Sequence, residues 1–194
     1  MRGPLLPSEV SARDNYPEGR NPWGQADVSV CGPILMTEPE LAFLLSVIPE
    51  RGAYCELGSW SASGLSWIAD RRPEVRCVGV DSFEGPSNRR MFGALANWGL
   101  RPNVDLFLGR IEHFAWQCDY FDAVLVDGDH HGFAVHRDLS VAEQIVKRHG
   151  VILTHDCGAP DHAEVQPAVE RFCAERGWVI AQRCDSLALL RWFR

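Results

Sequence analysis

Residues 53–64 read Ala-Tyr-Cys-Glu-Leu-Gly-Ser-Trp-Ser-Ala-Ser-Gly and join a short apolar run to a helical segment through a glycine-bearing turn. A strand that is buried in a parallel sheet has such a continuous apolar run. Gly58 allows the backbone of the turn to approach a ligand, and the start of the following helix presents N–H donors to an anion. The stretch therefore predicts a strand, a tight turn and a helix, with a ligand at the end of the strand.

The same alternation of strand and helix continues along the chain. Seven strands are predicted from apolar runs, at residues 53–57, 76–80, 104–108, 123–126, 151–154, 178–182 and 188–192. Helices are predicted after the capping box at residues 37–40 and from helical spacing at residues 65–71, 89–98, 133–148 and 164–175. The fold class is therefore α/β: a single Rossmann-like, doubly wound, mainly parallel sheet with helices on both faces and an antiparallel hairpin at one edge.

The composition is that of one globular domain. Of 194 residues, 46% are hydrophobic, and the formal net charge is -7 without a long basic cluster. This charge argues against nucleic acid as a partner, and the longest apolar stretch, residues 41–48, is too short to cross a membrane. The N-terminus has no secretory signal, and the seven cysteines form no C-x-x-C pair, so we expect a cytoplasmic protein with reduced thiols.

Residues 1–33 differ from the rest of the chain. They are rich in proline, glycine, asparagine and charged residues, which predicts an irregular N-terminal arm ahead of a domain at residues 34–194. The arm and the edge hairpin offer surfaces for a homodimer.

Polar residues follow the first two predicted strands, where the ligand crevice of such a sheet lies. Glu56 offers a negative charge to an amino group, and Asp81 is placed to accept both hydroxyl groups of a ribose. Phe83 is a candidate wall for an adenine. The turn is neither a G-x-G-x-x-G loop nor a Walker loop. An ordinary glycine-bearing turn and a solvated acidic residue are the alternative interpretations.

The fourth strand is followed by Asp127-Gly128-Asp129-His130. Asp127 is expected to point from its strand toward the two reactants, the group donor and its acceptor. His130 can take a proton from a hydroxyl of the acceptor. In the alternative interpretation, Asp129 only caps the helix that follows.

The fifth strand is followed by His155-Asp156. Together with Asp127 these residues form a candidate site for Mg²⁺ or another divalent cation, and His155 favours a softer ion than a carboxylate would. Without an ion, His155 is a candidate general base.

Taken together, these motifs resemble those of class I S-adenosylmethionine-dependent methyltransferases. Glu56, the Gly58–Gly64 loop and Asp81 resemble the first two motifs of that family, and residues 127–130 and 153–156 look like strand ends of small bacterial O-methyltransferases. Asp81-Ser82-Phe83-Glu84-Gly85 is similar to the macrocin O-methyltransferase group, which tailors sugar and antibiotic hydroxyls.

The resemblance implies a class I methyltransferase domain over residues 34–194 and a set of sites. The implied S-adenosylmethionine site consists of Glu56, Gly58, Ser59, Ser61, Gly64, Asp81, Ser82, Phe83, Arg110, Ile111 and Asp127. The family's acidic residue near the adenine is replaced by Arg110, which leaves backbone contacts from Arg110 and Ile111.

The implied reaction is methyl transfer to a hydroxyl of a small-molecule acceptor, with His130, His155 and Asp127 as catalytic residues and Asp127, His155 and Asp156 as metal ligands. Two alternatives stay open. One is a cofactor-binding module without chemistry, and the other is a metal-dependent hydrolase on the same architecture.

Overall fold

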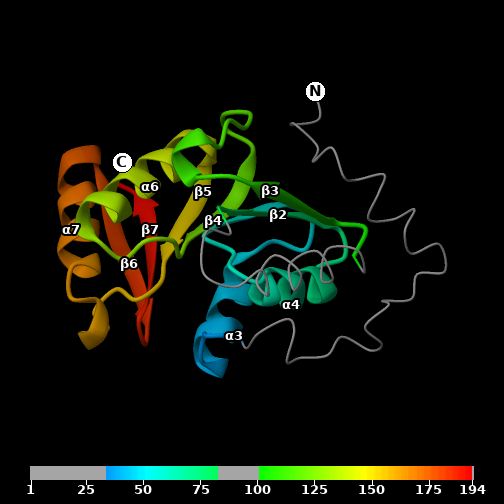
Figure 1. The fold of residues 1–194 in the computed structure, drawn as a ribbon, viewed down its shortest axis with the longest axis horizontal. Helices are drawn as coiled ribbons and strands as arrows, with labels where there is room; N and C mark the ends of the chain where they lie inside the picture. Colours follow the sequence, from blue (N-terminus) through cyan, green and yellow to red (C-terminus); the bar gives the residue numbers. More distant parts are fainter. Residues whose placement is uncertain (1–33, 83–100, 194) are drawn as a thin grey trace.

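The computed structural model describes residues 34–82 and 101–193, and these form one sheet of seven strands in the order β3-β2-β1-β4-β5-β7-β6 (Figure 1). The strands are β1 (Gly52–Leu57), β2 (Val75–Asp81), β3 (Val104–Leu108), β4 (Phe121–Val126), β5 (Val146–Thr154), β6 (Trp178–Cys184) and β7 (Leu187–Trp192). Strands β1 to β5 pair in parallel, whereas β7 is antiparallel to both β5 and β6. The predicted fold class is confirmed. The predicted arm, the helix at 89–98 and Phe83 lie outside the described residues.

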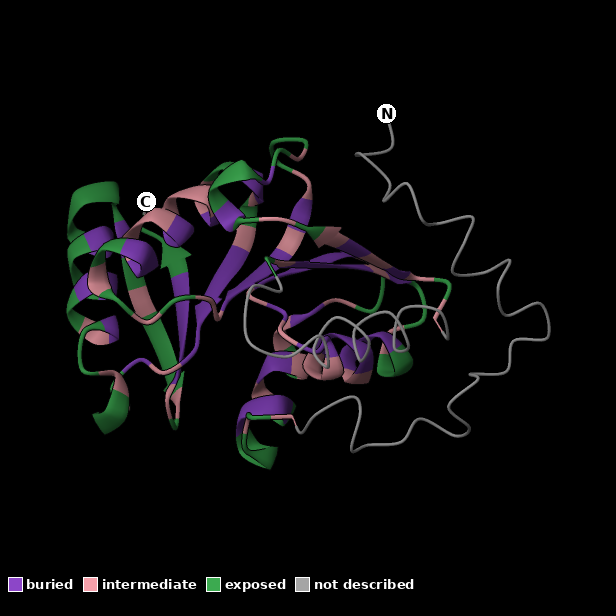
Figure 2. Cartoon of the chain, viewed as in Figure 1, coloured by how far each residue is buried: buried purple, intermediate pink, exposed green. Residues whose placement is uncertain are grey.

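Helices cover both faces of the sheet because successive side chains of each strand point to opposite faces. On β1, Tyr54 packs in the core beneath α3 (Glu38–Val47) and α4 (Ser63–Arg71). The adjacent Cys55 packs in the other core, beneath α6 (Gly132–Ile145) and α7 (Val165–Arg176). Figure 2 shows the buried strands between helices whose outer faces are exposed.

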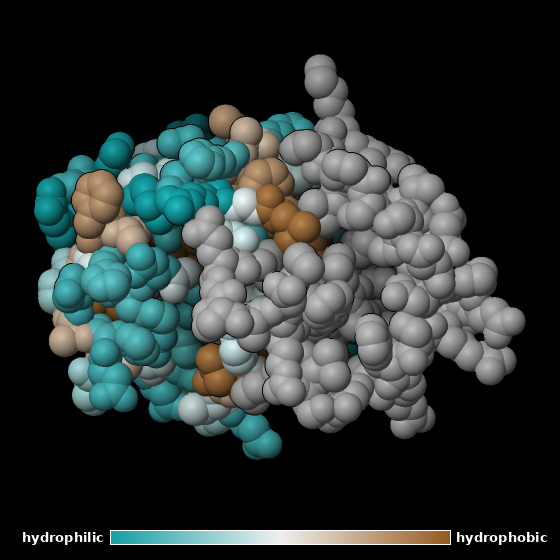
Figure 3. Space-filling model, in the orientation of Figure 1, coloured by the Kyte–Doolittle hydropathy of each residue, from teal (hydrophilic) through white to brown (hydrophobic). Residues whose placement is uncertain are grey.

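The outer surface fits this arrangement. In the view of Figure 3, the region over α6 and α7 is predominantly hydrophilic, as expected for helices that bury one face only. Among the described residues, no helix is long and apolar enough to cross a membrane.

The predicted capping box opens α3. Thr37 Oγ1 accepts a hydrogen bond from the Glu40 backbone N at 3.3 Å, and Glu40 Oε2 accepts one from the Thr37 backbone N at 2.9 Å. Two of the N–H groups at the helix start are thereby satisfied. This fixes the position of Glu40, which matters for the site below.

The predicted helix at 133–148 is wrong at its end. Helix α6 ends at Ile145, and β5 begins at Val146, which pairs with Phe121 of β4. Lys147 donates a hydrogen bond to Asp122 Oδ1 at 2.7 Å, which holds the extended backbone against β4. Gly150 follows the predicted helix but is part of the strand. It lies within β5, where an added Cβ would stand 2.8 Å from the Asp122 carbonyl oxygen.

Replacement of Phe172 on α7 tests the packing of the core that lies beneath α6 and α7. Phe172 is fully buried, so Phe172→Ala is expected to lower the free energy of unfolding by about 3–5 kcal/mol through lost burial and a cavity. Urea denaturation followed by circular dichroism measures the change. Phe133→Ala is the matched control, because the Phe133 side chain on α6 is 84% exposed. An equal loss in both variants would contradict the described packing.

Candidate functional site

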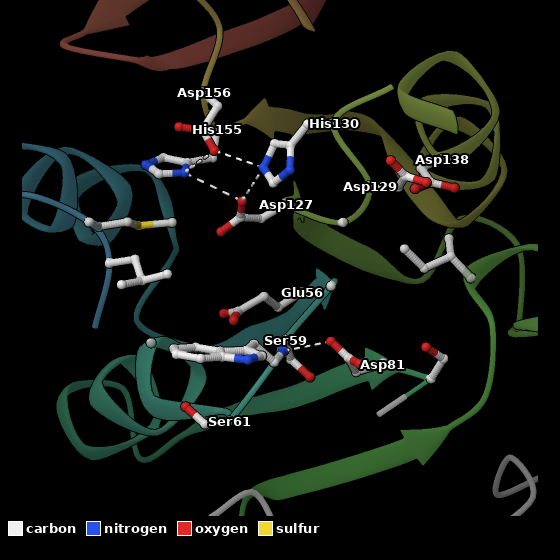
Figure 4. A pocket seen from close by; sticks show the side chains of 18 of the residues that line it. Glu56, Ser59, Ser61, Asp81, Asp127, Asp129, His130, Asp138, His155 and Asp156 are labelled. Atoms are coloured by element: carbon white, nitrogen blue, oxygen red, sulfur yellow. Dashed lines mark hydrogen bonds and ion pairs between the residues drawn. The ribbon is translucent and has the colours of Figure 1, made fainter. Parts of the chain in front are cut away.

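A pocket of about 710 Å³ lies at the carboxyl ends of the parallel strands (Figure 4). This volume suits a small-molecule ligand. The predicted site residues that line it are Glu56, Gly58, Ser59, Ser61, Gly64, Asp81, Ser82, Arg110, Ile111, Asp127, His130, His155 and Asp156. Of the predicted site residues, Phe83 alone lies outside the described part of the chain.

The turn after β1 is held close to the ends of β2 and β4. The backbone N atoms of Gly58 and Ser59 both donate to the Val80 carbonyl oxygen, at 2.8 and 3.1 Å. Gly58 has φ +93°, and an added Cβ would lie 2.2 Å from the Asp127 carbonyl oxygen, so this position requires glycine.

Two further residues of this turn adopt left-handed backbone conformations. Trp60 and Ala62 have φ of 45° and 55°, and α4 begins at Ser63, ahead of the predicted helix start at residue 65. The Ser59 hydroxyl is buried without a hydrogen-bond partner in the described structure.

Asp81 is fixed at the end of β2 by the same turn. Its Oδ2 accepts a hydrogen bond from the Trp60 backbone N at 2.7 Å. The carboxylate is only partly buried and faces the pocket. Asp81 thus has the position expected for a group that accepts hydrogen bonds from a ligand.

Glu56 is a buried carboxyl group among other acids. It is 6% exposed, and Tyr54 Oη donates a hydrogen bond to its Oε2 at 3.1 Å. Burial, and then the negative charge of Asp127, raise the pKa of Glu56 to about 8. In the absence of a ligand Glu56 is therefore mostly protonated at pH 7, and a cation beside it would favour the carboxylate.

Asp127, His130, His155 and Asp156 form a cluster on one side of the pocket, which we call the His-Asp cluster. The ladder between β4 and β5 brings them together, since the His155 backbone N donates to the Val126 carbonyl oxygen at 3.1 Å. His155 Nδ1 lies 3.4 Å from Asp127 Oδ1 and 3.2 Å from Asp156 Oδ2. His130 Nε2 lies 2.9 Å from Asp156 Oδ2. In Figure 4, Glu56 lies between this cluster and Asp81.

Electrostatics in the His-Asp cluster favour charged side chains. Burial lowers the pKa of His155, but hydrogen bonds from its ring to Asp127 and Asp156 outweigh burial and raise the pKa well above its ordinary value. The pKa of His130 is raised chiefly by its hydrogen bond to Asp156. Both contacts therefore stabilise the protonated form of the imidazole ring.

The sequence analysis missed Glu40, which lies behind this cluster. Glu40 is 2% exposed, and its Oε2 lies 3.5 Å from His155 Nε2. Its Oε1 accepts hydrogen bonds from the backbone N and the hydroxyl of Ser186, at 3.0 and 2.7 Å. The capping box marked Glu40 as a helix-start residue only, so no local signal pointed to the site.

His162 was missed as well. Its ring stacks on that of His130, with centroids 3.8 Å apart, and its Nε2 lies 3.9 Å from Asp156 Oδ2. It belongs to a short 3-10 helix, Pro160–His162, that follows β5. Its position depends on the path of that loop, which sequence spacing does not specify.

Asp129 does not cap α6, contrary to one interpretation of the sequence. Its Oδ1 accepts a hydrogen bond from the His131 backbone N at 3.0 Å, one residue before the helix. The first helical N–H, at Gly132, donates instead to Glu164 Oε2 at 2.8 Å. A loop residue distant in sequence thus replaces the local cap.

The far end of the pocket is formed by Ile111, Arg110 and one further residue that the sequence analysis missed, Asp138 on α6. Asp138 is fully buried, and its Oδ1 accepts a hydrogen bond from Arg137 Nε at 3.0 Å. Its Oδ2 has no hydrogen-bond partner in the described structure. Burial raises the pKa of Asp138 to about 6. The pocket therefore has an acidic group near the position where Arg110 replaces the family's acid.

Solved structures with a similar fold include several methyltransferases. Precorrin-6y C5,15-methyltransferase from Geobacter metallireducens has a TM-score of 0.61 and 18% identity, over 84% of this chain and 92% of that chain. Geranyl diphosphate methyltransferase, solved with sinefungin, has a TM-score of 0.57 and 11% identity, over 74% of this chain and 60% of that one.

Phosphoethanolamine N-methyltransferase 2 from Haemonchus contortus, solved with S-adenosyl-L-methionine, has a TM-score of 0.58 and 16% identity, over 79% of this chain and 40% of that one. The chain thus spans less than two thirds of the length of these last two proteins. At these identities the likeness shows a shared fold.

The sequence itself identifies the family. No curated protein sequence matches the chain. Residues 55–157, more than half of the chain, match a family described as a methyltransferase domain. This range includes nearly all of β1 to β5 and every strand end that lines the pocket. The chain therefore belongs to the methyltransferase domain family.

Proposed function

We propose that this methyltransferase takes S-adenosylmethionine as methyl donor and methylates a hydroxyl oxygen of a small molecule, of the sugar, phenol or antibiotic-like class. One observation carries the proposal. Two carboxyl groups from adjacent strands, Glu56 and Asp81, face one pocket on either side of the turn that starts at Gly58. An adenosyl amino acid has a matching ammonium group and ribose diol.

The pocket residues divide between the parts of such a ligand. Glu56 is assigned to the ammonium group, and Asp81 to the ribose hydroxyls. Ile111 offers an apolar surface to the adenine, with the backbone of Arg110 beside it. When bound, S-adenosylmethionine supplies a methyl group activated by a sulfonium charge. The task of this chain is then to align an acceptor oxygen and to remove its proton.

We assign proton removal to His130. It lines the pocket with 37% of its side chain exposed, whereas His155 is buried and held between carboxylates. Asp156 orients the His130 ring through the 2.9 Å contact to Nε2 and stabilises its protonated form. Asp127 and His155 would keep the acceptor oxygen close. This arrangement suits a hydroxyl, which must lose a proton as it is methylated.

The apolar wall of the pocket, ahead of α3, supports a small acceptor with apolar surface. Ile34, Leu35 and Met36 line the pocket, and the Leu35 side chain is 67% exposed. An exposed leucine at a pocket mouth favours contact with an apolar part of a ligand. We therefore propose an acceptor that combines a hydroxyl with apolar surface. A cytoplasmic location and a homodimer stay expectations from the sequence.

The resemblance also implies a divalent cation. Donor atoms of Asp127, His155 and Asp156 all lie within 4.8 Å of one another, so these residues fit a single ion. Such an ion would polarise the acceptor oxygen and lower the cost of its deprotonation.

Calorimetry with S-adenosylhomocysteine tests the cofactor assignment. Asp81→Asn removes the charge that accepts the ribose hydroxyls, and the affinity is expected to fall about 10- to 100-fold. Asp105→Asn is the matched control, since Asp105 pairs with Arg76 at 2.7 Å and does not line the pocket. Absence of saturable binding to the unmodified protein would refute the proposed function.

Proton release on binding tests Glu56. Because the pKa of Glu56 is raised to about 8, the side chain is protonated at pH 7 and should lose its proton when the ligand's ammonium group binds. Calorimetry in buffers of different ionisation enthalpy should show this release, and Glu56→Gln should abolish it. Glu112→Gln is the control. Glu112 also lines the pocket, but its own pKa is already lowered, so its replacement should leave the proton release unchanged. Unchanged proton release in Glu56→Gln would contradict the assignment.

Methyl transfer itself tests the chemistry. With labelled S-adenosylmethionine and a panel of hydroxylated acceptors, His130→Gln is expected to reduce transfer about 10²- to 10⁴-fold. Its affinity for S-adenosylhomocysteine should change less than about threefold, because the cofactor contacts are kept. Label found on nitrogen or carbon of the product would exclude O-methylation. Binding without any transfer would favour the binding module, and metal-dependent hydrolysis that persists in Asp81→Ala would favour the hydrolase.

A further inference from the structure

One carboxylate oxygen at the edge of the pocket is buried without a hydrogen bond in the described structure. It is Oδ2 of Asp138, on the second turn of α6. The side chain is fully buried, and its other oxygen, Oδ1, accepts a hydrogen bond from Arg137 Nε at 3.0 Å. A buried polar atom without a partner destabilises a folded protein, so native structures contain few of them. Asp138 Oδ2 is therefore suited to accept a hydrogen bond from a ligand.

A glycine after β4 leaves this oxygen open toward the pocket. Gly128 lines the pocket, and an added Cβ at this position would lie 3.0 Å from Asp138 Oδ2 and 2.8 Å from Ile111 Cδ1. A side chain at position 128 would thus fill the space that these two atoms share. Figure 4 shows Asp138 at the end of the pocket beyond Asp127 and away from His155. An apolar side chain and a hydrogen-bond acceptor therefore border the same small space at this end.

We propose that Asp138 selects the base of the methyl donor: its Oδ2 accepts a hydrogen bond from the exocyclic amino group of an aminopurine, and the pocket thereby excludes 6-oxopurines. The inference rests on the proposed function, which places the adenine against Ile111. A ring that packs on Ile111 has its edge within reach of Asp138 Oδ2, because both side chains border the space at Gly128. An amino group at that edge supplies the donor that Oδ2 lacks.

The chemistry of the base edge gives the selectivity. An ionised carboxylate only accepts hydrogen bonds, so it pairs with the amino group of adenine and not with the carbonyl oxygen of hypoxanthine. Where two acceptors face each other away from water, both lose their hydrogen bonds and repel each other. A site built around one hydrogen bond rejects the analogue that lacks it more strongly than an apolar surface rejects a small change in shape. Asp138 is thus a specificity residue.

Asp129 is a second acid at this end of the pocket, and its contacts argue against the same role. Its Oδ1 accepts a hydrogen bond from the His131 backbone N at 3.0 Å and lies 2.5 Å from the ring Nδ1 of the same residue. The Asp129 side chain is 54% exposed, so its other oxygen is open to water. Arg137 holds Asp138 differently. Its Nη2 lies 3.0 Å from Asp138 Oδ1 and 3.4 Å from Glu112 Oε2, which fixes Oδ1 and leaves Oδ2 for a ligand.

A comparison of two ligands tests the proposal. S-adenosylhomocysteine has an amino group on its base where S-inosylhomocysteine has a carbonyl oxygen. Calorimetry on the full chain should show that S-adenosylhomocysteine binds about 10- to 100-fold more tightly. In Asp138→Asn this preference should fall to about threefold or less, because an amide can turn either its NH₂ group or its oxygen toward the ligand. A preference that persists unchanged in Asp138→Asn would overturn the proposal.

Asp129→Asn is the matched control, since it replaces an acid that lines the same end of the pocket and should keep the preference of the unmodified protein. Loss of the preference in Asp129→Asn and not in Asp138→Asn would assign the contact to Asp129 and overturn the proposal.

Gly128→Ala gives an independent measurement, with circular dichroism to confirm that each variant folds. The added methyl group would lie 3.0 Å from Asp138 Oδ2. It should weaken binding of S-adenosylhomocysteine and reduce the preference without removing the carboxylate. An unchanged affinity and preference in Gly128→Ala would contradict the proposed path from the pocket to Asp138.

The unmodified protein separates this inference from the proposed function. If it binds neither ligand, the proposed function is refuted, and this inference with it. If it binds both ligands with equal affinity, the contact to the base is refuted and the methyltransferase proposal stands. A preference for S-adenosylhomocysteine that Asp138→Asn removes supports both.

Discussion

The site depends on one electrostatic constraint: three carboxyl groups from the ends of three adjacent strands share a single pocket. Glu56 is the next-to-last residue of β1, Asp81 ends β2 and Asp127 follows β4, and the parallel register places them at one edge of the sheet. Burial of Glu56, and then the negative charges of Asp127 and Asp81, raise the pKa of Glu56 to about 8. A cationic ligand would relieve this repulsion. The three carboxyl groups thus favour a ligand with positive charge, in agreement with the proposed donor, which carries both an ammonium and a sulfonium group.

Backbone hydrogen bonds hold the ends of these three strands together, and they restrict which residue can occupy position 58. The Asp127 backbone N donates to the Leu57 carbonyl oxygen at 2.8 Å, and the Gly58 backbone N donates to Val80 at the same distance. Three strand ends are therefore joined directly by hydrogen bonds around one glycine. A side chain at position 58 would separate β1 from β4 and move Asp127 away from Glu56. The carboxyl groups that line the pocket, Glu56, Asp81 and Asp127, consequently share a single structural support.

The strand-end residues could be predicted from the sequence because each lies next to an apolar run that defines its strand. Residues whose position depends on tertiary contacts could not be predicted from the sequence. Asp138 looks like a solvated helix residue, yet it is fully buried at the far end of the pocket. Val146 continues a helical apolar pattern, but its pairing with Phe121 places it in a strand. The spacing of apolar residues indicates which face of a helix or strand is buried. It does not indicate whether a backbone N–H or C=O group will bond within a helix or to a neighbouring strand.

Glu40 has two structural roles: it completes the capping box of α3, and it faces His155. As the third residue of α3 it completes the capping box, which sets the direction in which the chain enters the helix from Ile34–Met36. The same carboxylate faces His155 and is anchored by Ser186 in the turn between β6 and β7. The apolar wall of the pocket and the orientation of the His155 ring are therefore fixed by one buried side chain. Loss of its charge would disturb the apolar wall and the His-Asp cluster together, even though Glu40 itself does not line the pocket.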